Sequence, residues 1–247
     1  LQSTSRRQRQ MCIRYIYKDD AISSVEHRAN LVLLLKYGMD FIKNYTMSGW
    51  VKMPNYRLNL PDYSDRAIFE GLVNHLIHRD YTVMGGEVHI DIYDDRVELV
   101  SPGAMLDGTQ IQDRDIYKVP SMRRNPVIAD VFTQLDYMEK RGSGLRKMRE
   151  LTEKLPNFLQ GKEPQYQTEA TSFYTTFYNL NWGDNGRIPV EEVANRVNST
   201  LEKYLENEES SVEKFGGNRK SSEKTFGHSK QSSEKRSEKN QKGTEKN

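Results

Sequence analysis

The chain has 247 residues, enough for one domain of moderate size with extensions or for two small domains. Its hydrophobic content of 35% and its mean hydropathy of -0.84 are low for a compact domain, so part of the chain is expected to be unfolded. A net charge of +2 gives no global field that would demand nucleic acid. The single cysteine excludes an intrachain disulfide and favours an intracellular, cytoplasmic protein.

No membrane segment is expected. The longest apolar run, residues 31–35, is too short to span a bilayer. Residues 1–10 are polar and basic without an apolar stretch, so they are no signal peptide. The missing initiator Met suggests a fragment of a longer protein.

The first half of the chain predicts helices joined by a loop. Residues 25–43 predict a helix with leucines facing a core, and residues 55–63 predict a loop, with Pro54 and Pro61 as breakers of regular structure. Ser64 or Asp65 can cap the next helix, which runs to about Arg79.

The second half predicts a hairpin, two helices and a strand. Residues 87–93 and 96–100 alternate between apolar and polar side chains, which is typical of paired strands. Helices are predicted over residues 126–135, with Pro in the first turn, and over residues 145–154, followed by a strand over residues 171–180. These elements predict an α+β fold, a two-layer sandwich of a mixed sheet with helices on one face.

Glu70, Asn74 and His78 stand four residues apart in the central predicted helix. At about 100° per residue, Asn74 lies about 40° and His78 about 80° from Glu70, with apolar residues on the opposite half. Asn74 could therefore coordinate a hydrated Mg²⁺ while Glu70 orients or deprotonates a water. A polar helix edge bonded to a neighbouring loop explains the same spacing equally well.

Two glycine-containing segments are further candidates. Gly142 and Gly144 flank Ser143 at the start of a predicted helix, where glycines allow close approach of a ligand and free N–H groups favour an anion. A tight turn between helices is the alternative. Ser101 and Gly103 end a predicted strand, but such residues serve any turn.

A basic loop separates the hairpin from the next helix. Arg114, Arg123 and Arg124, followed by Asn125, could clamp phosphates or could simply be solvated. No Gly-x-x-x-x-Gly-Lys-Ser/Thr run occurs in the sequence, so it holds no P-loop and no helicase motor.

Five motifs follow one another along the chain, at residues 67–81, 92–98, 101–103, 124–126 and 139–144. Together they resemble a bacterial and archaeal family. The chain is similar, over about residues 31–180, to transcriptional regulators that are also described as RecG-related C-terminal domains. These resemble the GHKL (Bergerat) ATPase domain shared by gyrase B, a heat-shock chaperone class, histidine kinases and MutL.

The resemblance implies a domain that binds ATP and Mg²⁺. It makes Asn74 the Mg²⁺ ligand and Glu70 the general base, with glycines covering the phosphates. Ser101 stands where these ATPases have an Asp that reads adenine, so at most a weak Mg²⁺-dependent ATPase is implied, and no helicase. The nucleotide-binding residues implied are Asn74, His78, Ser101, Gly103, Arg123, Arg124, Asn125, Gly142, Ser143 and Gly144.

Five segments are expected. Residues 1–10 would be disordered or a remnant of a Schlafen AlbA-type domain, residues 11–63 a helical and loop region, and residues 64–182 the ATPase-like domain. Residues 183–207 would form a C-terminal helix, and residues 208–247, rich in Ser-Glu-Lys, a disordered linker. Family members commonly continue into a winged-helix domain, which implies DNA as a partner through a domain missing from this chain. A homodimer is compatible with this plan.

The sequence is compatible with three functions. The leading one is a nucleotide-binding regulatory domain of a bacterial transcriptional regulator, in which ATP closes residues 114–125 as a lid. The alternative is a scaffold for dimerisation or interaction that no longer binds nucleotide, and a filled cavity beside Asn74 would favour it. The third is DNA binding by the basic tail and the loop arginines, which would weaken steeply with salt.

Overall fold

The computed structural model describes residues 10–18, 20–53, 55–139 and 143–200. The chain divides into two units, Leu1–Ala194 and Asn195–Asn247, and the fold below is that of the first. Residues 190–194 of the first unit are helical, and so are the described residues 195–200 of the second. The expected tail, residues 208–247, lies outside the described residues.

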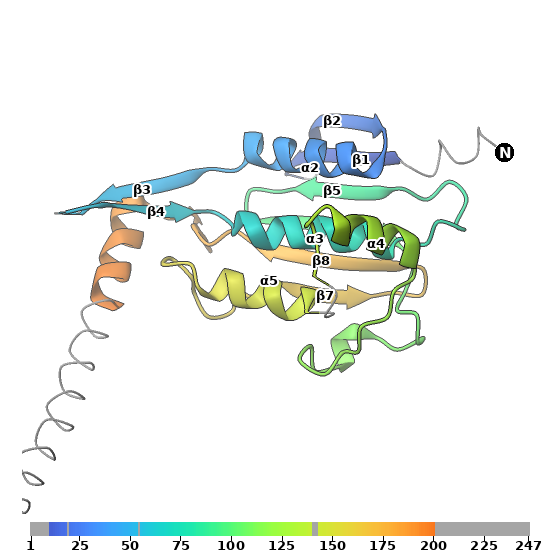
Figure 1. Ribbon diagram of the computed structural model, residues 1–247. Helices are drawn as coiled ribbons and strands as arrows, with labels where there is room; N and C mark the ends of the chain where they lie inside the picture. Colours follow the sequence, from blue (N-terminus) through green and yellow to red (C-terminus); the bar gives the residue numbers. More distant parts are fainter. Residues whose placement is uncertain (1–9, 19, 54, 140–142, 201–247) are drawn as a thin grey trace, which may run out of the picture. The chain divides into compact units, whose positions relative to one another are not determined.

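A mixed sheet of six strands, in the order β2-β1-β5-β6-β8-β7, is the centre of the fold (Figure 1). β1 pairs with β5 in parallel, and every other neighbouring pair is antiparallel. The expected α+β class is therefore confirmed. The strands are β1 (Gln10–Tyr17), β2 (Asp20–Arg28), β5 (Val88–Ile92), β6 (Arg96–Pro102), β7 (Gln165–Thr168) and β8 (Ser172–Tyr178).

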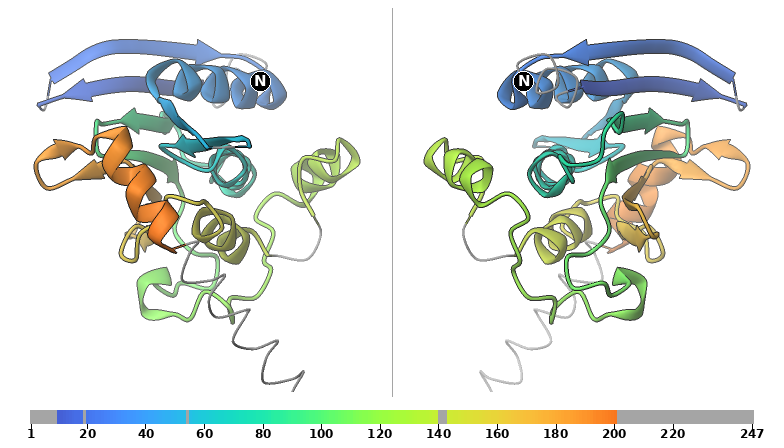
Figure 2. Two further views of the ribbon diagram at one scale, coloured as in Figure 1. Left: turned by 90° about the vertical axis from the view of Figure 1, so that its left-hand side faces the viewer. Right: turned by 90° about the vertical axis from the view of Figure 1, so that its right-hand side faces the viewer.

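Three helices cover one face of this sheet. α2 (Leu31–Tyr45) contacts β1 and β5, α3 (Asp65–His78) contacts β6 and β8, and α5 (Gly144–Glu153) packs beside α3. Figure 2 shows α4 (Pro126–Gln134) farther from the sheet than α3 is. None of the helices in the described ranges is long and apolar enough to cross a membrane.

Short elements complete the unit. β3 (Ser48–Lys52) and β4 (Arg57–Pro61) form a separate hairpin, and β9 (Trp182–Gly183) pairs with β10 (Gly186–Arg187). A 3-10 turn, η1 (Ile111–Asp113), follows β6 in the chain.

The core lies between the sheet and its helices. Apolar side chains alternate along the strands and face α2 and α3, which removes their surface from water. The residues of this core that are at most 1% exposed include Met11, Ile13, Leu34, Leu72, Leu76, Val88, Ile90, Ile92, Val97 and Leu99.

The predicted start of the helix over residues 25–43 is wrong. β2 continues to Arg28, and α2 begins only at Leu31, where the Asn30 side chain accepts a hydrogen bond of 2.9 Å from the Leu33 N–H. β2 is an edge strand with no buried residue, so it lacks the alternation that marks a strand. The loop predicted over residues 55–63 is likewise wrong, because β4 occupies most of it. The region expected to be helix and loop thus adds two strands to the main sheet.

Gly71 lets α3 lie directly on the sheet. A Cβ atom at this position would be 3.0 Å from the Leu99 Cδ1 atom on β6 and 3.0 Å from the Phe177 ring on β8. Contacts that short are rare for real Cβ atoms, so a side chain here would require Leu99, Phe177 or the helix itself to shift by a few tenths of an ångström.

His75 joins α3 to β8 inside the core. The residue is 2% exposed, and its Nε2 atom lies 3.0 Å from the Thr175 hydroxyl. Burial, helped by nearby His78, lowers the pKa of His75 to about 3. The ring is therefore neutral in the folded protein at physiological pH.

We expect Gly71→Val to destabilise the fold by about 1–3 kcal/mol, the usual cost of overpacking a core. Urea unfolding measures the change. Asn44→Val, at an exposed position of α2, is the control for placing a β-branched residue in a helix. Equal stability of the Gly71→Val variant and this control would contradict the packing described for α3.

A second prediction concerns acid stability. Because the pKa of His75 is lower in the folded than in the unfolded chain, its contribution to stability is complete above pH 6.5 and is lost as the pH falls toward about 3. Wild type should therefore lose roughly 2–4 kcal/mol more than His75→Gln between pH 6.5 and pH 4. Urea titrations at each pH test this. Parallel losses in both proteins would show that His75 is not the group responsible.

Candidate functional site

A cavity of about 140 Å³ opens beside α3, at the end of the sheet where β6 finishes and β8 begins. Its walls come from α3, the segment after β6, the first turn of α5 and the start of β8. Its lining residues are Asn74, His75, His78, Ser101, Gly103, Ala104, Met105, Leu106, Ile116, Val119, Pro120, Ser121, Met122, Arg124, Gly144, Leu145 and Phe173.

The structure brings together six of the residues singled out in the sequence. Glu70, Arg123, Asn125 and Ser143 do not line the cavity, and Gly142 lies outside the described residues. Residues from four separate sequence motifs therefore meet at one place. The six that line the cavity are Asn74, His78, Ser101, Gly103, Arg124 and Gly144.

Asn74 and Gly144 touch at one end of the cavity. A Cβ atom at Gly144 would be only 2.5 Å from the Asn74 Nδ2 atom, so glycine allows the first turn of α5 to approach the amide. Among the residues that the structure describes, the Asn74 side chain has no hydrogen-bond partner. An amide oxygen and the free N–H groups of a helix start are therefore available to one ligand.

Glu70 lies behind this end, one turn before Asn74 on α3. Its side chain is 6% exposed, and its Oε2 atom lies 3.6 Å from the Lys147 ammonium and 3.7 Å from the Arg66 guanidinium. Burial raises the pKa of Glu70, while Lys147 and Arg66 lower it in part. The carboxylate is thus basic but turned toward two cations of its own chain.

Side chains of the basic loop make ion pairs and hydrogen bonds with other parts of the fold. Arg124 pairs with Asp80 at 3.1 Å and donates to the Ala104 carbonyl, while Arg123 pairs with Asp130 at 3.1 Å. The Asn125 amide donates to two carbonyls at the end of α3, those of residues 77 and 79. Arg124 is the one residue of these three that reaches the cavity.

Ser101 and Gly103 form the floor where β6 ends. Ser101 is 2% exposed. Gly103 has a φ of +111°, and a Cβ atom there would be 2.9 Å from the Cβ of Asp80. The backbone conformation and this close approach both require glycine.

The opposite wall of the cavity is apolar. It comes largely from the irregular segment between β6 and α4, whose residues show no periodicity in the sequence. Sequence reasoning therefore predicted the polar end and missed this wall. Its main side chains are Met105, Leu106, Ile116, Val119, Met122 and Phe173.

The charge at the site is modest. Burial lowers the pKa of His78, and the nearby Arg124 and Arg123 lower it further, so the imidazole is mainly neutral at pH 7. The charge of Arg124 is balanced by Asp80. No group of three metal-ligating side chains occurs at this cavity among the described residues, so a cation here would need oxygens from its ligand or from water.

Comparison with solved structures shows what the fold resembles. One similar structure is the DIP2311 protein from Corynebacterium diphtheriae, with a TM-score of 0.59 and 18% sequence identity. The likeness covers 74% of this chain but 35% of that protein, so the chain spans about a third of its length. At this identity the likeness extends to the fold alone. No curated protein matches the chain.

A family comparison covers the second part of the unit. The model HATPase_c_4, described as "Putative ATP-dependent DNA helicase recG C-terminal", matches residues 85–177. This span contains the floor, the apolar wall and the α5 end of the cavity, whereas Asn74 and the rest of α3 precede it. Over residues 85–177 the chain therefore matches the model of the RecG-related C-terminal domains.

Proposed function

We propose that the chain is the ATP-binding regulatory domain of a bacterial transcriptional regulator. The observation that carries this proposal is the cavity in which Asn74 and the start of α5 form a polar end opposite an apolar wall. A nucleotide has the same division, with an anionic phosphate chain at one end and a flat base at the other. The family match over residues 85–177 supports ATP as that nucleotide.

The polar end fits phosphates and a hydrated Mg²⁺. Helix starts favour anions because their first N–H groups are unpaired and the helix dipole is positive there. The Asn74 oxygen is a hard ligand suited to Mg²⁺, which keeps several waters and binds phosphate oxygens. The bound ion would neutralise phosphate charge, a task that Arg124 can share only in part because Asp80 already pairs with it.

The apolar wall fits the base. Its side chains would remove the two faces of an adenine ring from water, and the buried Ser101 offers a hydroxyl for one polar edge atom. A hydroxyl holds an amino group less firmly than a carboxylate does. We therefore expect weak discrimination between adenine and other purines.

Hydrolysis, in this proposal, is slow or absent. Glu70 has the raised pKa that suits a general base, but it does not line the cavity and lies beside Lys147 and Arg66. ATP would thus act mainly as a ligand. It would draw residues 114–125 over the cavity, and DNA would be bound by a domain outside this chain.

The alternative, a scaffold that has lost its ligand, has less support. Such a scaffold would be expected to fill the space beside Asn74 with side chains. The cavity there is open and reaches the amide.

Calorimetry with Mg-ATP, ADP and a nonhydrolysable ATP analogue tests the binding. We expect Asn74→Ala to raise the Kd of Mg-ATP at least about tenfold, equal to about 1.4 kcal/mol. Asn44→Ala, at an exposed position of α2, is the matched control and should bind as wild type does. Absence of binding by wild type at millimolar Mg-ATP would refute the proposal.

Phosphate release tests the role of Glu70. We expect a wild-type turnover well below the common range of about 1–1000 s⁻¹. Glu70→Gln should lower any remaining rate by about 100-fold, the loss typical of a general base, and leave the Kd within about twofold. Glu150→Gln on α5 is the control, since its partner Arg146 lies away from the cavity lining. Fast turnover, or loss of binding in Glu70→Gln, would contradict this assignment.

A further inference from the structure

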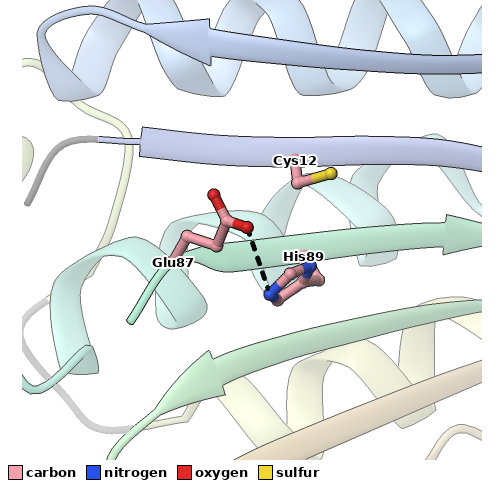
Figure 3. Close-up of side chains that lie close together, drawn as sticks. All are labelled: Cys12, Glu87 and His89. Atoms are coloured by element: carbon pink, nitrogen blue, oxygen red, sulfur yellow. Dashed lines mark ion pairs between the residues drawn. The ribbon is translucent and has the colours of Figure 1, made fainter. Parts of the chain in front are cut away.

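A second cluster of reactive side chains lies away from the cavity, on the face of the sheet that the helices do not cover. Cys12 on β1 and His89 on β5 are direct partners in the parallel pairing, so their side chains emerge side by side. Glu87 lies two residues before His89 and shares its face. One ligand atom from each residue lies within 4.8 Å of the other two (Figure 3).

Two atoms of this cluster are buried without a hydrogen-bond partner in the structure. They are the Glu87 Oε2 and the His89 Nδ1 atoms. Buried polar atoms are normally satisfied, and an orphaned pair on neighbouring side chains indicates a missing partner such as an ion or a water. In the described part of the chain the ion-pair partner of Glu87 is His89, at 3.7 Å, and the Arg79 guanidinium interacts with the Glu87 charge from beyond ion-pair distance.

We propose that Cys12, Glu87 and His89 form a binding site for a divalent transition-metal ion of the zinc class. Thiolate, imidazole and carboxylate are the protein ligands of Zn²⁺, and a soft thiolate discriminates against Mg²⁺ and Ca²⁺. Three protein ligands leave the fourth tetrahedral position to a water. Ligand atoms around Zn²⁺ are about 3.3–3.6 Å apart, so side-chain rotations that close the present spacing by about 1 Å complete the site.

Other uses of these residues fit less well. Burial raises the pKa of Cys12, and the Glu87 charge raises it further while a hydrogen bond with Ser24 lowers it in part. The thiol is therefore protonated at neutral pH and is no activated nucleophile. A disulfide within the chain is excluded because Cys12 is the only cysteine.

A metal here would cross-link two parts of the chain. β1 and its neighbour β2 contact the rest of the sheet through β5 alone. A metal held by Cys12 on one strand and by His89 with Glu87 on the other would fix that junction. The role assigned is structural, and it is independent of nucleotide binding at Asn74.

The test uses the whole chain, reduced and without a polyhistidine tag. Calorimetry with ZnCl₂ should give one site per chain, unchanged by excess Mg²⁺. Co²⁺ should produce the charge-transfer absorption of a thiolate ligand, and Zn²⁺ should protect Cys12 from alkylation. Cys12→Ser should abolish the absorption. His89→Gln and Glu87→Gln should each weaken Zn²⁺ binding by at least about 100-fold, because replacing a residue that only contacts a metal ligand usually weakens binding by about 10- to 100-fold.

Glu26→Gln is the matched control. Glu26 is the antiparallel partner of Cys12 on β2, the strand that flanks β1 away from β5, and its carboxylate pairs with Arg28. This variant should bind Zn²⁺ as wild type does. Circular dichroism establishes that each variant is folded. Absence of a stoichiometric site, or Zn²⁺ binding that survives Cys12→Ser, would overturn the proposal, as would equal losses in Glu26→Gln and Glu87→Gln. Because Mg-ATP binding is measured separately, neither result depends on the other.

Discussion

The close packing of α3 on β6 and β8 is the constraint on which the rest of the unit depends. Gly71 allows the helix to approach the strands so closely that a Cβ atom there would be 3.0 Å from both Leu99 and Phe177. That approach buries the apolar side of α3 and leaves Asn74 lining one end of the cavity. α5 then packs against α3 through the contact of Gly144 with Asn74. Two glycines thus determine where the helices lie and where the cavity opens.

Much of this arrangement is visible in the sequence, because it follows from periodicity. The apolar positions of α3 and the alternation of β5, β6 and β8 have periods of 3.6 and 2, which indicate helix and strand directly. The stripe of Glu70, Asn74 and His78 follows from the same helix. Its members nevertheless differ in the structure, since Asn74 and His78 line the cavity while Glu70 lies behind it.

Other parts have no local signal. β2 is exposed along its whole length, so nothing in its composition separates a strand from a helix start. The apolar wall of the cavity comes from an irregular segment in which Met105 and Ile116 are brought together only by the fold. Cys12 and His89 are far apart in the chain, and only the parallel register of β1 and β5 makes them neighbours. Long-range pairing is the information that local patterns lack.

That parallel register also bears on the order of folding. β1 and β5 pair from Met11 with Val88 to Tyr15 with Ile92, and β2, two helices and the β3–β4 hairpin lie between them in the chain. Closing so long a loop costs entropy before any pairing is gained, whereas the β5–β6 and β7–β8 hairpins close short ones. The β1–β2 hairpin should therefore join the sheet late. Until it does, β5 presents an unpaired edge that can recruit a strand from another molecule, and crowding during synthesis would turn that delay into aggregation.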